Sequence, residues 1–219
     1  MAPHLSPVIV AGLGLAGLAA GPALASLARR LPGDASRRPD PFPGRHALAA
    51  AVAGGVGAAA GLLETSWGGA LLTALLGWHL LLIALVDGEH YWLPDRLTLP
   101  LLAAGIAAAA ALDRLGIVEA LIGAVAGFAV LWLLAWVYRK VRGREGLGGG
   151  DPVLLAAIGA WTGWTGLPGV LLWAALAGLS VVAGRAAAGR RVSGADRLPF
   201  GVFLALGGWL TWVFGPPGL

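Results

Sequence analysis

Long apolar segments separated by short polar turns constrain the fold of this chain more than any other feature. Most of these segments are long enough to cross the roughly 30 Å hydrocarbon core of a bilayer as a helix. A backbone inside lipid must satisfy its own hydrogen bonds, so only helices and closed barrels can cross. Since the segments are long and continuously apolar, we predict an all-α integral membrane protein.

The composition agrees with a bilayer setting. Hydrophobic residues make up 58% of the chain and charged residues 12%, about half of the charged fraction of a soluble domain. There are no cysteines, which excludes disulfides and thiolate metal sites. The net charge is +4, but the charges lie in short loops, where they set membrane topology. We therefore expect a lipid bilayer, and no nucleic acid, as the partner of this surface.

Apolar length and turn signals predict a polytopic bundle of about eight transmembrane helices. Their approximate ranges are 6–28, 47–63, 68–86, 94–112, 117–138, 152–165, 168–184 and 198–214. The turn between the sixth and seventh segments is placed at Gly166 to Pro168. Small residues are abundant and would let the helices approach closely in lipid. We divide the chain into an N-terminal two-helix region, 1–66, with a short cytoplasmic loop at 29–46, and a six-helix core, 67–219.

The basic residues predict the orientation of these segments. If the N-terminus lies outside, four loops fall on the cytoplasmic side, and they contain 14 of the 15 Lys and Arg residues. Only Arg114 falls on the other side. This distribution follows the positive-inside rule. It places both termini on the outer, periplasmic side and the ends of the third and fifth segments in the cytoplasm.

Two aspartates lie where apolar segments meet cytoplasmic turns. Asp87 follows the third segment, and Asp151 precedes the sixth, directly after a glycine-rich run. An acid is costly near lipid, and an acid at a helix C-terminus meets the unfavourable end of the helix dipole. Solvation at the interface is the structural alternative for Asp87. Asp151 before Pro152 is also typical of a helix N-cap.

The residues around the two aspartates give further clues. The glycines at 148–150 lose backbone entropy on folding, so we expect them where the backbone approaches a substrate strand or the other carboxylate closely. Pro94 fits the first position of the fourth helix. Asp95, in its first turn, would complement the helix dipole. We therefore expect Asp95 to support the site structurally.

Two stretches carry a family resemblance. ALVDGEHYWLPDRLTLP (84–100) resembles the first signature of the type IV prepilin peptidases, in which an Asp is followed by LPD, LT and Pro. EGLGGGD (145–151) resembles their second signature, the GxGD box. Stretches 12–32, 154–164 and 198–210 also resemble segments of this family of bacterial membrane aspartic proteases, so the likeness covers most of the chain.

The resemblance implies a function. It assigns Asp87 and Asp151 as the catalytic pair of an enzyme that cleaves the basic leader of prepilins or pseudopilins at the cytoplasmic face of the bacterial inner membrane. Two close carboxylates share a proton, because both cannot ionise easily. One would then act as base on water and the other as acid on the scissile amide. The supporting loop residues would be Pro94, Asp95, Glu145, Gly148, Gly149 and Gly150.

The chain also departs from the family pattern. Many members carry a larger cytoplasmic domain after the first helix, with paired CxxC motifs that bind zinc, and here that region is only 29–46 and has no Cys. We therefore expect no zinc and no other cofactor. The resemblance gives little reason to expect N-methylation with S-adenosylmethionine, an activity associated with the shortened region. Pro152 and Val153 stand after the GxGD box, where the family usually has a Lys two residues on.

Two other functions stay open at this point. A catalytically degenerate assembly factor of a pilus or secretion system would fit Val153 and the shortened loop, although both aspartates are retained. A proton- or cation-coupled transporter would use Asp87 and Asp151 as a relay, but such acids are expected near the bilayer midplane. The aspartates here lie at segment ends on one side, which favours the peptidase.

Overall fold

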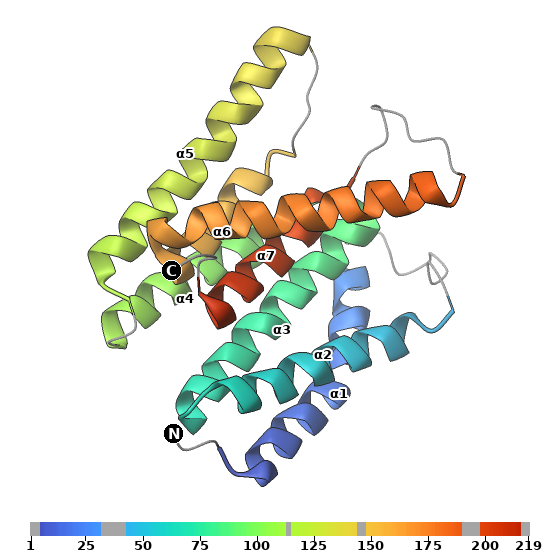
Figure 1. Ribbon diagram of the computed structural model, residues 1–219, viewed down its shortest axis with the longest axis vertical. Coiled ribbons are helices and arrows are strands. Elements are labelled where there is room, and N and C mark those ends of the chain that lie inside the picture. Colours follow the sequence, from blue (N-terminus) through green and yellow to red (C-terminus); the bar gives the residue numbers. More distant parts are fainter. Residues whose placement is uncertain (1–4, 32–42, 113–114, 144–147, 190–197, 216–219) are drawn as a thin grey trace. The chain divides into compact units, whose positions relative to one another are not determined.

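The computed structural model describes residues 5–31, 43–112, 115–143, 148–189 and 198–215 of the chain. Within these ranges the secondary structure is entirely helical (Figure 1). The helices are α1 (Pro7–Arg30), α2 (Arg45–Leu63), α3 (Trp67–His90), α4 (Asp95–Ala111), α5 (Ile117–Arg142), α6 (Asp151–Ala187) and α7 (Phe200–Phe214). The prediction of an all-α protein is confirmed for the part of the chain that the structure describes.

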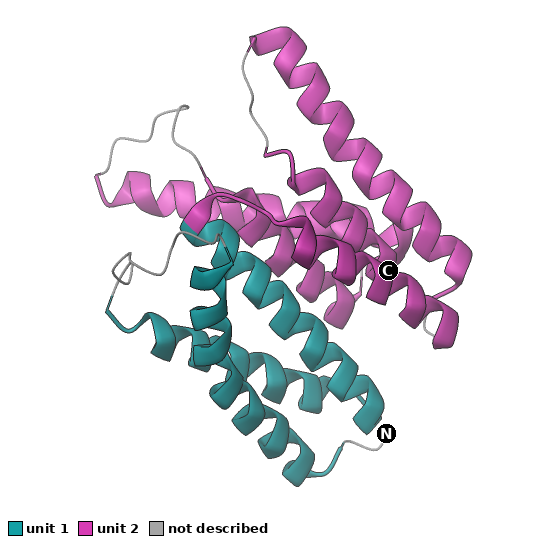
Figure 2. Cartoon of the chain, turned by 180° about the vertical axis from the view of Figure 1, so that it is seen from behind, with its two compact units in different colours: residues 1–89 teal, residues 90–219 magenta. Residues whose placement is uncertain are grey.

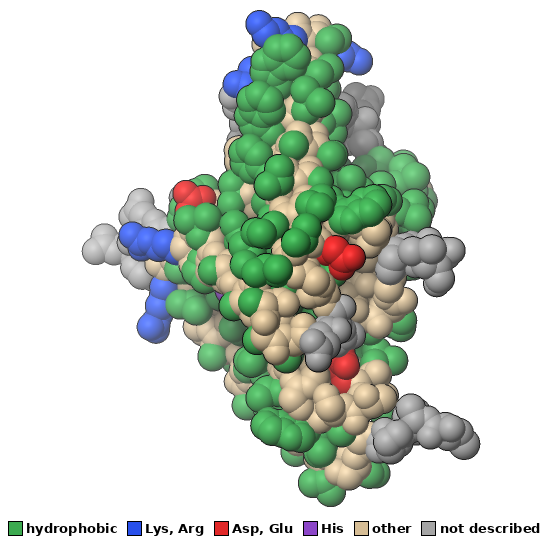
Figure 3. Space-filling model, turned by 90° about the vertical axis from the view of Figure 1, so that its left-hand side faces the viewer, with side chains coloured by type: hydrophobic (Ala, Val, Ile, Leu, Met, Phe, Trp, Pro, Cys, Tyr) green, Lys and Arg blue, Asp and Glu red, His purple; other side chains and the backbone are tan. Residues whose placement is uncertain are grey.

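Helix length and surface composition fit a membrane protein. Five helices, α1, α2, α3, α5 and α6, are long and apolar enough to cross a bilayer, and α7 is a shorter apolar helix. Large apolar side chains point outward, as at Val125, which is 71% exposed. Figure 3 shows hydrophobic side chains over most of one face, with basic side chains gathered at a helix end. The number of crossings and the sides of the two termini stay predictions.

Helix α6 differs from the predicted sixth and seventh segments. It has 37 residues, which as a straight helix would be about 55 Å long, and it kinks at Gly163 rather than at Gly166 to Pro168. Gly163 has φ 69° and ψ 174°, a backbone region that is essentially restricted to glycine. Pro168 lies five residues after the kink, inside the second part of the helix. The turn was therefore predicted a few residues too late.

The chain forms two compact units, residues 1–89 and 90–219 (Figure 2). The first unit contains α1, α2 and most of α3, and the second contains the remaining helices. This division follows packing. The predicted functional division at residue 66 stays a prediction.

Small residues set the distance between α1 and α2 in the first unit. A Cβ added to Gly17 or Gly21 would collide with the backbone of α2 at Ala53 or Ala49. The side chain of Trp78 on α3 donates a hydrogen bond to the Ala53 carbonyl oxygen, at 2.9 Å. Close backbone approach through small residues is the usual packing of helices in lipid, and here it confirms the prediction from composition.

The second unit uses the same device between α5 and α6. A Cβ on Gly123 would collide with the Gly159 carbonyl group, and one on Gly127 would lie 2.5 Å from the Leu155 carbonyl oxygen. Trp161 of α6 joins two other helices. Its indole N–H donates to the Leu101 carbonyl oxygen of α4 at 2.9 Å, and its ring meets the Trp212 ring of α7 edge to face at 5.4 Å. These contacts fix the first part of α6, which begins at Asp151.

Candidate functional site

Asp87 lies in the last turn of α3. The helix continues to His90, four residues beyond the predicted end of this segment, so Asp87 is inside the helix and not in the loop after it. Its side chain is buried, with 5% exposed. Burial removes the proposed structural alternative, in which Asp87 simply solvates at the interface. A buried acid near the C-terminus of a helix is unfavourable twice, from desolvation and from the helix dipole, which is typical of functional positions.

The chain leaves α3 through a strained residue. Tyr91 has φ 51° and is the one non-glycine residue with positive φ in the part of the chain that the structure describes. The left-handed region is disfavoured for residues with a Cβ by about 1–2 kcal/mol. Glycine usually ends a helix in this way. Such strain tends to occur at functional loops, and this one lies four residues after Asp87.

The loop after Tyr91 leads into α4, which begins one residue later than predicted, so the prediction of Pro94 at the first helical position is wrong. Leu93 and Pro94 are buried. Pro94 precedes the helix in an extended conformation, with φ −76° and ψ 134°, and Asp95 is the first helical residue. The side chain of Asp95 is exposed and lies at the positive end of the helix dipole. The predicted position of Asp95 in the first turn is thus confirmed, and its supporting role stays a prediction.

Asp151 is the first residue of α6, and its side chain is 4% exposed. The N-cap residue is Gly150, and no side chain makes a capping hydrogen bond. The alternative interpretation of Asp151 as an N-cap is therefore wrong. Instead, the backbone N–H of Gly148 donates to Asp151 Oδ2 at 2.9 Å. This bond fixes the orientation of the carboxylate relative to the preceding turn.

The three glycines before Asp151 differ in what surrounds them. A Cβ on Gly150 would lie 2.6 Å from the Cβ of Leu93, so the glycine turn packs directly on the loop that precedes α4. A Cβ on Gly149 would meet nothing within 4 Å, and one on Gly148 would meet only the Asp151 carboxyl group. Close approach is thus confirmed for Gly150, but its neighbour is Leu93. Glu145 lies outside the described residues.

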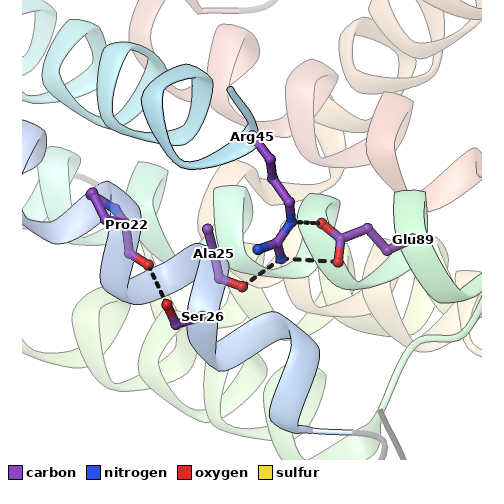
Figure 4. Close-up of polar contacts among 5 residues, drawn as sticks. All are labelled: Pro22, Ala25, Ser26, Arg45 and Glu89. Carbon is purple, nitrogen blue, oxygen red and sulfur yellow. Dashed lines mark hydrogen bonds and ion pairs between the residues drawn. The ribbon is translucent and has the colours of Figure 1, made fainter. Parts of the chain in front are cut away.

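A buried ion pair lies beside Asp87 in the sequence and joins the three helices of the first unit (Figure 4). Arg45 Nε lies 2.6 Å from Glu89 Oε1, and Arg45 Nη2 lies 2.9 Å from Glu89 Oε2. Nη2 also donates to the carbonyl oxygen of Ala25 on α1. Two parallel hydrogen bonds of this kind are the strongest and most directional form of an arginine–carboxylate contact.

This ion pair was not predicted from the sequence. Arg45 was counted only as a loop charge that sets topology, and Glu89 was considered only as a neighbour that could tune Asp87. An arginine at the very start of an apolar segment, in a chain with few charges, was the available signal. The partner lies 44 residues away in the sequence, and no helical spacing links the two.

The structure brings together some of the predicted site residues. In the second unit, Gly148, Gly150 and Asp151 form one turn, and this turn contacts Leu93 next to Pro94. Asp87 belongs to the first unit and Asp151 to the second, so the pairing of the two carboxylates stays a prediction. Among the described residues, no group of three or more His, Asp or Glu side chains could hold a metal ion. What the described residues offer chemically is two buried carboxylates, one in each unit and each at a helix end.

Comparison with known proteins adds to this geometry. The model of the type IV leader peptidase family matches residues 74–183, a range that includes both aspartates. A protein of Burkholderia pseudomallei named prepilin leader peptidase/N-methyltransferase is 43% identical over 178 residues, which are 81% of this chain and 57% of that protein. Proteins of the same name from Aeromonas hydrophila and Pseudomonas aeruginosa are 40% and 42% identical, over 70% and 67% of this chain and 52% and 50% of theirs. The chain thus spans about half the length of these relatives, and no solved structure matches it.

Proposed function

Because the chain belongs to the type IV leader peptidase family, we propose that it is a membrane aspartic endopeptidase that cleaves the leader peptide of prepilins or pseudopilins. The observation that carries this proposal is the burial of Asp87 and Asp151. Each is at most 5% exposed and lies at the end of a helix in the family's matched region. Buried acids are rarely kept in a membrane protein without a function.

In the proposed reaction the two aspartates act as one pair. The carboxyl groups share a proton, because two adjacent negative charges are unfavourable. The ionised carboxylate removes a proton from water, and the water oxygen attacks the carbonyl carbon of the scissile amide. The protonated carboxyl then gives its proton to the leaving nitrogen, and the C–N bond breaks. The proton belongs to the pair, and we assign neither role to one aspartate.

The turn before α6 supports this chemistry. The Gly148 N–H donates a hydrogen bond to one oxygen of Asp151. Gly150 packs on Leu93, so the turn that carries this carboxylate is held in place. Gly148 and Gly149 are exposed and carry no side chain. An extended substrate segment can therefore approach their backbone closely, which is the role that glycine serves best.

The name of the relatives, prepilin leader peptidase, supports the choice of substrate. A prepilin or pseudopilin presents a basic leader in front of a hydrophobic helix. The exposed apolar side chains of this chain suit a helix that stays in the bilayer, and a cytoplasmic active site suits the leader. We place the enzyme in the bacterial inner membrane with its active site toward the cytoplasm, on the basis of the positive-inside distribution. Relatives are named for an additional N-methyltransferase activity, and we do not extend that activity to this chain.

Leader cleavage tests this function. The purified chain is incubated in detergent with a prepilin from the same organism, and the product is weighed by mass spectrometry. The parent is expected to release the leader, while Asp87→Asn and Asp151→Asn each lower the rate at least about 1,000-fold. Glu119→Gln, which removes an exposed acid in the first turn of α5, is the matched control and should cleave like the parent.

The same experiment decides between the alternatives. Cleavage that survives both aspartate variants would refute the aspartic mechanism. A folded parent that fails to cut its own prepilin would favour the assembly factor instead. The mass of the new N-terminus also shows whether a methyl group has been added.

A further inference from the structure

We propose that Arg45 and Glu89 are a positioning pair that holds the last turn of α3, and with it Asp87, in the geometry that peptide cleavage needs. The effect on the reaction rests on the proposed function. The effect on the position of Asp87 rests only on the contacts within the first unit. Glu89 lies two residues after Asp87, and both belong to the same helical turn.

The pair ties α3 to both other helices of its unit. Arg45 is the first residue of α2, its side chain is 1% exposed, and its guanidinium reaches the Glu89 carboxylate and the Ala25 carbonyl oxygen together. Figure 4 shows these bonds meeting at one guanidinium group. Three helices thus converge on one planar group with fixed bond directions. Helix ends usually fray, and this one is held from the side by two bonds.

The positions of Asp87 and Glu89 on α3 distinguish two roles for Arg45, which are positioning the helix and compensating the charge of Asp87. Side chains two residues apart on a helix point to different faces. The bidentate contact of Arg45 is with Glu89, so it holds the helix from a face that Asp87 does not share. The Asp87 side chain can therefore point to another face of α3, while the contact between Arg45 and Glu89 fixes the backbone of the same turn.

Helix dipoles explain why these charges need each other. Arg45 stands at the positive end of α2 and Glu89 at the negative end of α3, and each is unfavourable at its own helix end. When the two side chains pair, each charge lies near a helix end that favours it, because the cation faces the C-terminal end of α3 and the anion faces the start of α2. A buried ion pair contributes little net stability, because desolvation opposes the attraction. Its main effect is to select one arrangement of the helices.

Spin labelling tests the position of the helix end without relying on activity. The chain has no cysteine, so Gly88→Cys adds a single thiol at an exposed position beside Asp87. A nitroxide on this thiol reports the mobility of the last turn of α3. The full-length chain in nanodiscs is compared with the same chain carrying Arg45→Gln, Arg45→Lys or the double change Arg45→Gln/Glu89→Gln.

We expect each of the three changes to increase the mobility of the label. Lysine keeps the charge but cannot form the two parallel bonds, so Arg45→Lys should show an intermediate effect. The double change leaves no unpaired buried charge and should keep the thermal midpoint near that of the parent, which guards against a variant that fails to fold. In the control, Arg142→Gln removes an exposed arginine at the end of α5 and should leave the label unchanged.

Kinetics on the unlabelled variants test the link to the reaction. A displacement of the aspartate by about 1 Å is expected to lower kcat by about 100-fold, with KM within about twofold, because leader binding is untouched. The inference is overturned if the folded double variant shows the label mobility and the kcat of the parent, since charge balance alone would then explain the pair. If the parent itself cleaves no prepilin, the proposed function fails, and the label mobility still decides the positioning role.

Discussion

The contact between Gly150 and Leu93 predicts a large difference between two neighbouring glycines. In Gly150→Ala the new Cβ would lie 2.6 Å from the Leu93 Cβ, whereas an ordinary contact is 3.4–4 Å. The turn or the loop must therefore move by at least about 0.8 Å, a displacement large enough to lower a reaction rate by about 100-fold if it reaches the catalytic carboxylate. Overpacking of this kind also lowers the free energy of unfolding by about 1–3 kcal/mol.

Gly149→Ala is the matched variant. A Cβ there meets nothing within 4 Å, and the residue has no positive φ. The substitution should leave stability unchanged or raise it slightly, by up to about 1 kcal/mol, because alanine restricts the unfolded chain.

The assay is thermal unfolding in detergent, followed by the fluorescence of the ten tryptophans. Leader cleavage is measured on the same samples. We expect Gly150→Ala to lower the midpoint and the cleavage rate together, and Gly149→Ala to keep the midpoint. Equal midpoints for the two alanine variants would refute the packing of the glycine turn on Leu93.

Three further predictions concern stability and use the same unfolding assay. Gly123→Ala should destabilise the chain by about 1–3 kcal/mol because its Cβ meets the backbone of α6, while Gly12→Ala, with no atom within 4 Å, should not; equal midpoints would contradict the close α5–α6 contact. Trp161→Phe should cost about 1 kcal/mol or more from the lost hydrogen bond to Leu101, and a midpoint equal to that of the parent would show that this bond is not formed. Tyr91→Val should be less stable than Tyr91→Gly, because a β-branched residue is disfavoured at φ 51°; the reverse order would argue against the left-handed turn.

Much of the fold follows from the sequence because lipid leaves few alternatives. Length and apolar character indicate each helix, since an unpaired backbone cannot exist in a bilayer. The errors lie at helix ends. Asp87 was predicted just beyond its helix, but α3 continues through Gly88 to His90. The break in α6 was predicted at Gly166 to Pro168, where the residue types are typical of a turn, and the structure places it at Gly163. Several glycines in this part of the sequence could have formed the break, and the packing of the folded chain determines which one does.

Some features of the candidate site were predicted from the sequence, and others were not. Asp95 was placed correctly in the first turn of its helix, because Pro followed by an acidic residue marks such positions. Asp151 was predicted just before the helix that it begins. A close backbone approach at Gly150 was predicted, but its partner was not, since the contact with Leu93 joins two loops that are separated by more than one helix. The pairing of Arg45 with Glu89 was missed for the same reason. Periodicity describes neighbours along one helix, and these contacts depend on tertiary structure.

Asp87 and Asp151 are proposed to work as one pair, and a crosslink between the two positions tests this pairing. In the cysteine-free chain, Asp87→Cys/Asp151→Cys is treated with a short dithiol-bridging reagent in the presence of a prepilin, and the linked tryptic peptides are identified by mass spectrometry. The control is Gly148→Cys/Asp151→Cys, whose positions lie within one turn. We predict a bridge in both variants. A bridge in the control, with none between positions 87 and 151, would contradict the paired site.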